Sequence, residues 1–292
     1  MDPLVIVFGL GVGILIGLTG IGGGSLMTPL LVLVIGTKPV VAVGTDIAYG
    51  ALTKTLGGWR HWRSGTVDMG ISKWLAFGSV PASVGGVILV SEVPGLHGKG
   101  VLWGVASALL FTAVVTISRA LFLTAPVERH SVPLDRRGKV GAVVLGALLG
   151  FLLGITSVGS GALVGLALIL VFKLTPHRVV GTDVFHAALM LWAAGLAHVA
   201  EGNIDYGLMG TILIGSIPGV VIGERLARVV PAGALRPALG CVMLGSGLGV
   251  LTKVGADLSP WVIVGAPALV GVAAYAVSLS RSRSTAPAPT TP

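Results

Sequence analysis

The chain has 292 residues, of which 54% are hydrophobic and only 10% are charged, and its mean hydropathy is +0.97. Soluble domains carry roughly 25% charged residues, so a water-soluble globular protein is excluded and an integral membrane protein is predicted. The net charge of +8 comes from basic residues spread among the loops, which the positive-inside rule explains without a nucleic-acid partner. The single cysteine, Cys241, excludes a cysteine-based metal cluster, and we expect no cofactor and no metal site.

Long apolar blocks follow one another along the chain, and most have the length of about 20 residues that a helix needs to cross a bilayer. In chain order they are 4–36, 40–58, 69–90, 99–123, 140–173, 177–199, 206–224, 234–252 and 261–280. The first and fifth blocks are too long for one crossing, and each has a cluster of glycines near its middle. We therefore expect each of these two blocks to be a hairpin of two short helices that enters and leaves on the same side.

The second half of the sequence repeats the first. Residues 13–89 align without a gap on residues 150–226, with about 28 identities. Among them, Pro39 matches Pro176, and the segment Gly44-Thr45-Asp46 matches Gly181-Thr182-Asp183. The chain is therefore predicted to be a duplicated membrane unit.

Charges in the loops predict that the two units are inverted relative to each other. The loop with Arg60 and Arg63 corresponds to a loop with Glu201 and Asp205 that has no Lys or Arg. The next pair of loops reverses this difference, since 225–236 is strongly basic. Because basic loops face the cytoplasm, equivalent loops lie on opposite faces, with the N-terminus outside and the C-terminus in the cytoplasm.

The expected fold is an all-α polytopic membrane protein with two inverted repeats, each with a broken-helix hairpin, plus an extra C-terminal helix. The expected divisions are a first repeat, a cytoplasmic linker, a second repeat, an extra transmembrane helix and a disordered cytoplasmic tail, at 1–124, 125–139, 140–253, 254–280 and 281–292.

The two glycine-rich breaks predict an anion site near the middle of the membrane. A helix that restarts after such a turn directs free backbone N–H groups and its positive dipole end into the membrane, and that combination binds anions. The alternative is that the glycines only allow tight helix packing. The candidate substrate-binding residues are Thr19, Gly22, Gly23, Gly24, Ser25, Thr45, Thr156, Ser157, Gly159, Ser160, Gly161 and Thr182.

Two acidic side chains, Asp46 and Asp183, fall at membrane depth, where a carboxylate is costly and indicates function. They are candidates to couple transport to an ion, or alternatively to cap a helix break. His186 lies on the same helix face as Asp183 and is a third coupling candidate, unless it is simply hydrogen-bonded. Lys54 follows Asp46 by about two helical turns. We favour snorkelling of this lysine to the membrane surface over a charge offered to the substrate.

Two stretches of the first half resemble the signature of the TauE/SafE sulfite exporter family, also called TSUP. They are Gly17–Leu31 (GLTGIGGGSLMTPLL) and Pro39–Thr45 (PVVAVGT), and a degenerate copy recurs at 154–182. The copy departs from the first stretch in having Leu166 where the first half has a proline, and in being rich in serine. The resemblance covers residues 4–252. It implies a transporter of the prokaryotic inner membrane for sulfur-containing or organic anions such as sulfite, thiosulfate and sulfonates.

We therefore expect a secondary transporter that moves a small anion by alternating access, with proton or sodium coupling left open, and not an enzyme. A passive anion channel is the alternative within transport. A rhomboid-type intramembrane protease is disfavoured because the segment 159–161 lacks the required Gly-x-Ser-Gly order. A purely structural membrane protein would not explain duplicated polar breaks. The partners expected are the anion and the lipid bilayer, and the sequence leaves the oligomeric state open.

Overall fold

The structure is a computed structural model in which the described residues are all helical except for turns, short connections and an isolated bridge at Leu174. The described ranges are 3–19, 24–122, 134–159, 161–226, 229 and 232–284. Five helices are long and apolar enough to cross a membrane: Met69–Glu92, Lys99–Ser118, Arg136–Thr156, Pro176–Ala200 and Tyr206–Gly223. The prediction of an all-α, multi-pass membrane protein is confirmed.

Each half contributes five helices, which follow one another in the same order. The first half consists of α1 (Pro3–Thr19), α2 (Gly24–Leu30), a π-helical turn (Leu31–Ile35), α3 (Pro39–Arg63), α4 (Met69–Glu92), a short 3-10 turn (Pro94–Leu96) and α5 (Lys99–Phe122). The second half consists of α6 (Arg136–Thr156), α7 (Ala162–Leu170), α8 (Pro176–Ala200), α9 (Tyr206–Leu226) and α10 (Ala232–Lys253).

Helix starts are encoded in the same way in both halves. α3 and α8 each begin with a proline at the first helical position, where its fixed φ suits the helix and its missing N–H costs nothing. Asp68 caps α4 by accepting a hydrogen bond from Ile71 N, and Asp205 accepts the equivalent bond from Leu208 N at the start of α9. The expected linker lies mostly outside the described residues, and α6 begins within it, at Arg136.

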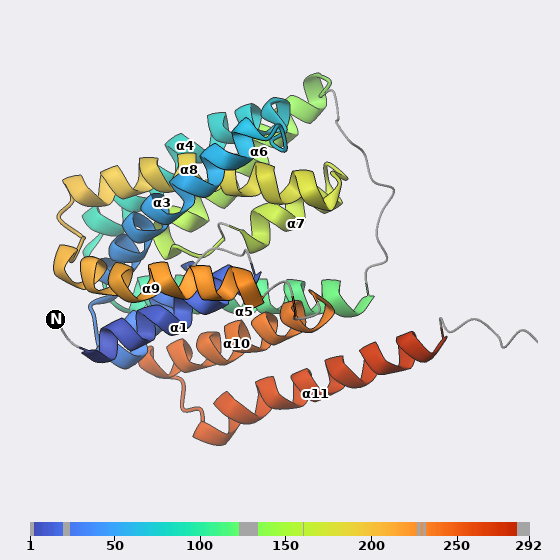
Figure 1. Cartoon of the computed structure of the whole chain (residues 1–292). Coiled ribbons are helices and arrows are strands. Elements are labelled where there is room, and N and C mark those ends of the chain that lie inside the picture. The colour runs from blue at the N-terminus through green and yellow to red at the C-terminus, as the bar shows by residue number, and fades with distance from the viewer. Residues whose placement is uncertain are drawn as a thin grey trace, which may run out of the picture.

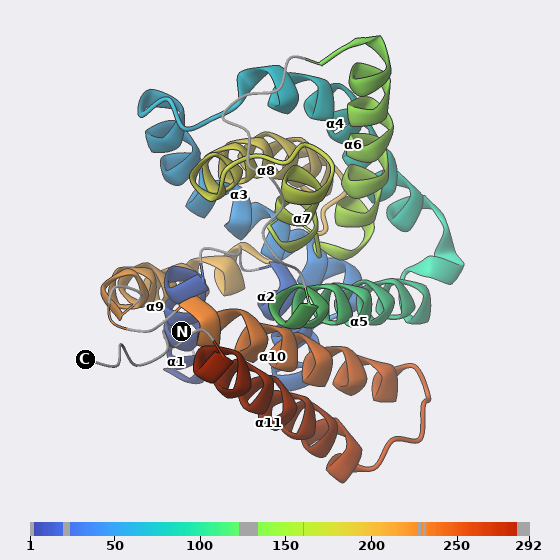
Figure 2. The same ribbon diagram turned by 90° about the vertical axis from the view of Figure 1, so that its right-hand side faces the viewer.

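An additional helix, α11 (Pro260–Ser284), follows the two halves and packs on the outer side of α10 (Figures 1 and 2). The sequence predicted this helix, although α11 continues to Ser284 rather than ending near residue 280. The rest of the expected disordered tail lies outside the described residues.

The halves are interlocked by helix pairs that each take one helix from each half. α1 packs along α9, and α4 packs along α6, as Figure 2 shows. Both pairs run parallel and approach backbone to backbone, because Gly13 lies against Ser216 and Gly150 lies against Ser79. The glycines have no side chain to keep the helices apart. These four residues are equivalent in the repeat, so the two contacts are copies of each other.

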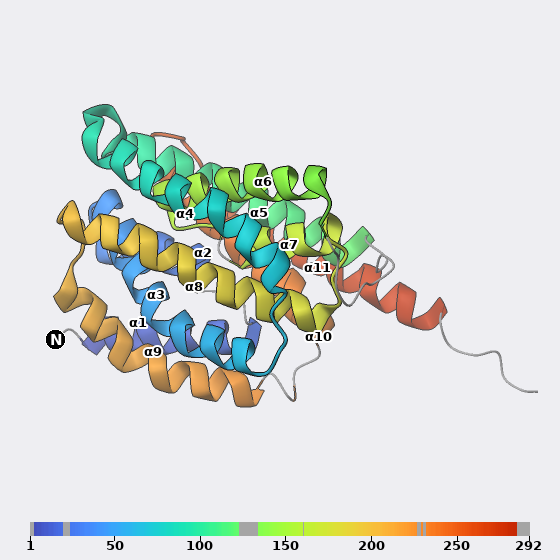
Figure 3. The same cartoon turned by 90° about the horizontal axis from the view of Figure 1, so that it is seen from above.

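Two further helix pairs join equivalent helices of the two halves. α3 packs against α8, and α5 against α10. Both pairs are antiparallel, since Gly44 near the start of α3 meets Asn203 beyond the end of α8, while Gly58 near the end of α3 meets Phe185. Equivalent helices of the two halves therefore run in opposite directions in these pairs. Figure 3 shows α3 and α8 crossing the middle of the molecule.

In the second half, the helices on the two sides of the break can be placed relative to their neighbours. α6 starts level with the start of α4, where the Lys139 ammonium lies 5.3 Å from the Trp74 ring centre. α8 starts at the same end, since Arg178 near its beginning pairs with Asp68, the cap of α4. The chain between them therefore enters with α6 and returns with α7.

The hairpin of the first half follows from the same reasoning. α1 starts beside the start of α9, because Gly9 lies against Ile212. α3 also starts there, because the N–H of Asp205 just before α9 donates to Thr45. The break itself, residues 20–23, is outside the described residues.

Candidate functional site

The break of the second half is a tight turn with an unusual backbone. α6 ends at Thr156, and Ser157 follows in the left-handed conformation with φ 60°. Gly159 and Gly161 have φ 124° and 119°, which side chains with a Cβ rarely adopt. The Thr156 hydroxyl accepts a hydrogen bond from the N–H of Val158 at 3.1 Å. Gly159 and Gly161, which were predicted to form part of the anion site, are therefore required by the turn, whatever else they do.

The side chain of Asp46 joins the two halves at their breaks. This carboxylate on α3 is 1% exposed. Its Oδ2 accepts hydrogen bonds from the Thr28 hydroxyl on α2 at 2.6 Å and from the Ser157 hydroxyl at 2.9 Å. Thr28 belongs to the hairpin of the first half and Ser157 to the break of the second. Two predicted site residues, Asp46 and Ser157, are thus in direct contact, and the carboxylate connects both hairpins.

Asp183, the equivalent carboxylate on α8, has different surroundings. It is also buried, at 6% exposure, and its Oδ1, like that of Asp46, makes no hydrogen bond within the described part of the chain. The residue equivalent to Thr28 is Gly165, and the residue equivalent to Ser157 is Gly20. Neither glycine has a hydroxyl group to donate. The hydrogen bonds that hold Asp46 are therefore not available to Asp183.

Lys54 is a third charged residue in the interior. Its exposure is 8%, and it interacts electrostatically with Asp183 and with Asp46. The interpretation that Lys54 snorkels to the membrane surface is wrong, because packing of α3 against α8 encloses the side chain. The alternative use of Lys54, as a positive charge in the interior, is the one that fits its position.

His186 also faces this interior group. Its Nε2 lies 3.2 Å from the hydroxyl of Ser79 on α4, and Lys54 is close enough to interact with the ring. The equivalent residues in the other half are Tyr49 and Ser216, which face each other without completing a hydrogen bond. His186 and Tyr49, one helical turn after the aspartates, thus face α4 and α9 respectively.

Thr45 and Thr182 have a shared structural task. The hydroxyl of Thr182 accepts a hydrogen bond from the N–H of Asp68 at 2.8 Å, and the hydroxyl of Thr45 accepts one from the N–H of Asp205 at 3.0 Å. Each threonine is fully buried and holds the start of a helix in the opposite half. Both were predicted to bind substrate, and the structure places them at these reciprocal contacts next to the aspartates.

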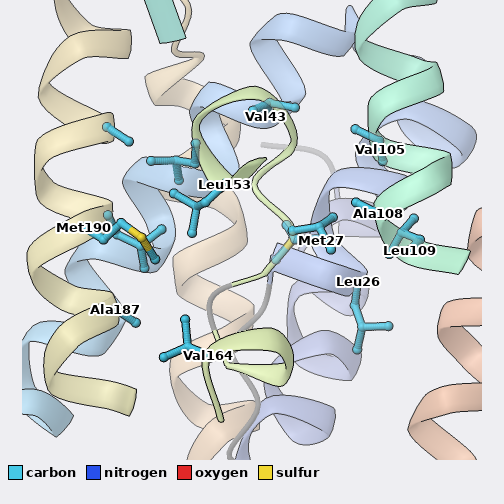
Figure 4. Close-up of a cluster of buried hydrophobic side chains, with 14 of the residues drawn as sticks. Leu26, Met27, Val43, Val105, Ala108, Leu109, Leu153, Val164, Ala187 and Met190 are labelled. Atoms are coloured by element: carbon cyan, nitrogen blue, oxygen red, sulfur yellow. The ribbon is translucent and has the colours of Figure 1, made fainter. Parts of the chain in front are cut away.

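Buried apolar side chains surround α2 in the interior of the molecule. In Figure 4, Met27 from α2 lies between Leu153 from the end of α6 and Ala108 and Leu109 from α5. All four are buried. The carboxylate of Asp46, which is 1% exposed, thus lies in a largely apolar interior.

A groove of about 560 Å³ lies elsewhere, between α4 and α8. It is lined mainly by apolar residues, including Phe77 and Leu189, which are exposed on the outer face of the helices. This groove faces the surroundings of the bundle, and it is not the enclosed centre between the breaks. No cluster of three or more metal-ligating side chains occurs among the described residues.

The remaining predicted site residues are placed only in part. Thr19 is the last residue of α1, and Gly24 and Ser25 begin α2. Gly22, Gly23 and Ser160 lie outside the described residues. Sequence reasoning did not single out Thr28, because its equivalent is a glycine and the repeat therefore gave no signal for it.

Comparisons with known proteins agree with this architecture. The family model described as sulfite exporter TauE/SafE matches residues 5–250. A probable membrane transporter protein, YjnA of Bacillus subtilis (strain 168), is 36% identical over 253 residues, which are 85% of this chain and 99% of the relative. The probable membrane transporter protein YdhB of the same organism is 27% identical over 230 residues, 78% of this chain and 91% of the relative.

A third relative, a probable membrane transporter protein of Xylella fastidiosa (strain 9a5c), is 26% identical over 237 residues, 78% of this chain and 86% of the relative. No solved structure matches the chain. The family match covers both halves and both breaks, and all three relatives are named as transporters. The chain belongs to the sulfite exporter TauE/SafE family of membrane transporters.

Proposed function

We propose that this protein is a secondary transporter that moves a small sulfur-containing or organic oxyanion, of the sulfite, thiosulfate or sulfonate class, across the prokaryotic inner membrane. The observation that carries the proposal is the position of Asp46, whose carboxylate is hydrogen-bonded to the hairpins of both halves. Two hairpins that meet at one buried polar centre are what a central binding site between repeats requires. The substrate would bind between the breaks, at their backbone N–H groups and hydroxyls.

The directions of the helices support an inverted arrangement in the membrane. With the N-terminus outside, inversion requires α3 and α8 to cross in opposite directions, α1 to run parallel to α9, and α4 to run parallel to α6. The glycine contacts of these three pairs have those directions. Basic loops then face the cytoplasm, and the C-terminus lies there too.

Alternating access requires bodies that move relative to each other. The backbone contacts of Gly13 with Ser216 and of Gly150 with Ser79 leave no room for α1 to slide on α9 or α6 on α4. In our proposal each of these pairs moves as a unit, so the moving bodies are made of helices from both halves. The hairpins move with α1 and α6, so the distance between the two hairpins changes at Asp46.

Asp46, Asp183 and His186 are the proposed coupling residues. An ionised carboxylate next to the site repels an anion, whereas a protonated one does not. Protonation of Asp183 would therefore favour anion entry, and transport is expected to speed up as the pH falls. Coupling to sodium remains the alternative, because a carboxylate also attracts a cation.

The test uses the purified protein in proteoliposomes with a panel of sulfite, thiosulfate, taurine and sulfate. A carrier should accumulate one of these anions against its gradient when a pH or sodium gradient is imposed. A channel should only let the gradient decay. Asp183→Asn should flatten the rise of transport at low pH, since the amide cannot take up a proton. If no panel anion crosses the membrane or shifts the thermal stability of the protein, the proposed substrate class is wrong.

A further inference from the structure

At one point along the contact between α3 and α8, a residue of α3 touches its own repeat equivalent on α8. The indole N–H of Trp192 donates a hydrogen bond of 2.8 Å to the hydroxyl of Thr55, and these two residues are equivalent in the repeat. Gly50, one turn earlier on α3, lies against Leu191. The local two-fold axis that relates α3 to α8 therefore passes beside Thr55.

Lys54 directly precedes Thr55 in the chain, so this cation lies next to the axis. Its equivalent on α8 is Leu191, which carries no charge. The duplication has thus left one lysine where the two halves meet. Symmetry places Asp46 and Asp183 at matching positions on the two sides of the axis. Both carboxylates can therefore interact with an ammonium group near the axis. Its electrostatic interactions with both carboxylates agree with this placement.

The two carboxylates differ in what holds them, although each has a buried Oδ1 that makes no hydrogen bond among the described residues. Oδ2 of Asp46 is engaged by the hydroxyls of Thr28 and Ser157. Asp183 lacks those donors, and the other titratable group facing Lys54 from α8 is His186. A buried ammonium needs a negative partner, because removing a charge from water costs several kcal/mol unless it is compensated. Asp183, which has glycines where those two hydroxyls stand, is therefore the carboxylate that we assign to Lys54.

We propose that Lys54 is the cation that binds the substrate anion, and that Asp183 neutralises Lys54 when the transporter is empty. The inference rests on the proposed function and names the charge that the anion recognises. An ammonium offers three N–H donors and suits the three oxygens of a sulfite or sulfonate group. The substrate replaces Asp183 as the partner of Lys54, and Asp183 takes up a proton or turns away.

This exchange gives both capture and release. A site with an uncompensated lysine would hold the anion tightly, whereas a tethered carboxylate competes with the anion and lets it leave. It also makes Asp183 and Asp46 unlike in function, although they are equivalent in the repeat. Asp46 holds the hairpins, and Asp183 competes with the substrate.

The experiment compares Asp183→Asn with Asp46→Asn in proteoliposomes, with sulfite and thiosulfate as probes. Asp183→Asn removes the competitor without changing the shape of the side chain. We expect it to lower the KM and the dissociation constant for the anion about tenfold, because a charged hydrogen bond is freed for the substrate. The maximal rate should fall as well, since release becomes slower. The matched Asp46→Asn variant should not lower the KM.

Removing the cation tests the other half of the proposal. Lys54→Met should abolish anion binding and also lower stability, because Asp183 is left buried without its partner. The double variant Lys54→Met with Asp183→Asn should regain thermal stability but not anion binding, whereas Lys54→Arg should retain binding. Lys73→Met removes an exposed lysine on α4 and is the control.

Two results would overturn the inference while leaving the proposed function intact. One is transport by the double variant at the wild-type rate, which would make Lys54 and Asp183 a purely structural ion pair. The other is an unchanged or higher KM in Asp183→Asn. By contrast, a wild-type protein that neither binds nor moves any panel anion would contradict the proposed function itself.

Discussion

Asp46 and Asp183 occupy equivalent positions on α3 and α8, and the backbone around them is nearly the same in the two halves. Both follow a threonine that holds the opposite half, and both are buried. Their carboxylates nevertheless meet different neighbours. Asp46 accepts two hydroxyl hydrogen bonds from the hairpins, whereas Asp183 has glycines at the positions equivalent to those donors.

This difference separates the parts of the molecule that the duplication keeps from those that it has changed. The repeated contacts are glycine packing and threonine capping, which hold helices of one half against helices of the other. The changed contacts are the polar groups between α3 and α8. The contacts that pack the helices together have therefore kept the symmetry of the repeat, and the polar residues at the centre have lost it.

The largest expected effect comes from breaking the frame. A Cβ added at Gly13 would lie 2.7 Å from the Cα of Ser216, and one added at Gly150 would lie 2.6 Å from the Cα of Ser79. Because the neighbours are backbone atoms that cannot move aside, we expect Gly13→Ala and Gly150→Ala each to cost about 3 kcal/mol or more. Both variants should give little folded protein in size-exclusion chromatography.

Each of these variants has a control on its own helix. A Cβ at Gly11 on α1 or at Gly141 on α6 meets nothing within 4 Å. Gly11→Ala and Gly141→Ala should therefore behave like the wild type. If Gly13→Ala folds normally while Gly150→Ala does not, the two frame contacts are not the copies that we describe.

An intermediate effect is expected at the carboxylate that joins the hairpins. Asp46→Ala leaves the hydroxyls of Thr28 and Ser157 buried without an acceptor, at about 1–3 kcal/mol for each group. Asp46→Asn retains a carbonyl oxygen and should cost much less. Thermal unfolding in detergent gives both values, and adding Thr28→Val to Asp46→Ala should recover part of the loss. Equal stability of Asp46→Ala and wild type would contradict the joining role.

The smallest effect is expected at the reciprocal threonines. Thr45→Val and Thr182→Val each remove one acceptor from a buried helix start, so each should cost about 1 kcal/mol. Thr112 on α5 is a matched control, because its hydroxyl only bonds to the carbonyl of Ala108 in its own helix. Thr112→Val should change the melting temperature less than either variant. If Thr45→Val and Thr182→Val lowered the stability by different amounts, the two contacts would not be energetically equivalent, although their hydrogen bonds correspond to each other.

Much of the fold could be predicted because its determinants are local or repeated. The lengths of the apolar blocks predicted the helices, and the prolines at 39 and 176 predicted the starts of α3 and α8. The alignment of the halves predicted that their elements follow in the same order. Blocks too long for one crossing predicted that the helix is interrupted within each of them, and the second of these interruptions lies between α6 and α7. Each of these signals depends on a short segment of sequence or on its copy.

The pairing of side chains at the centre could not be predicted in the same way. The hydrogen bond from Ser157 to Asp46 joins residues 111 positions apart, and Thr28 has no equivalent that would mark it. Lys54 was misjudged because sequence does not show that its position lies next to the axis between the halves, away from the membrane surface. These contacts depend on how α3 and α8 cross, which is decided by packing over the whole bundle.

The crossed pairing of α1 with α9 and of α6 with α4 has a consequence for how such a chain arises. The first half by itself contains α1 but not α9, the helix on which α1 packs. A single unit would have to pack α1 on its own α4, the equivalent of α9, or on α4 of a second copy. Fusion of two units in one chain fixes their stoichiometry and allows equivalent positions to diverge, as Lys54 and Leu191 illustrate.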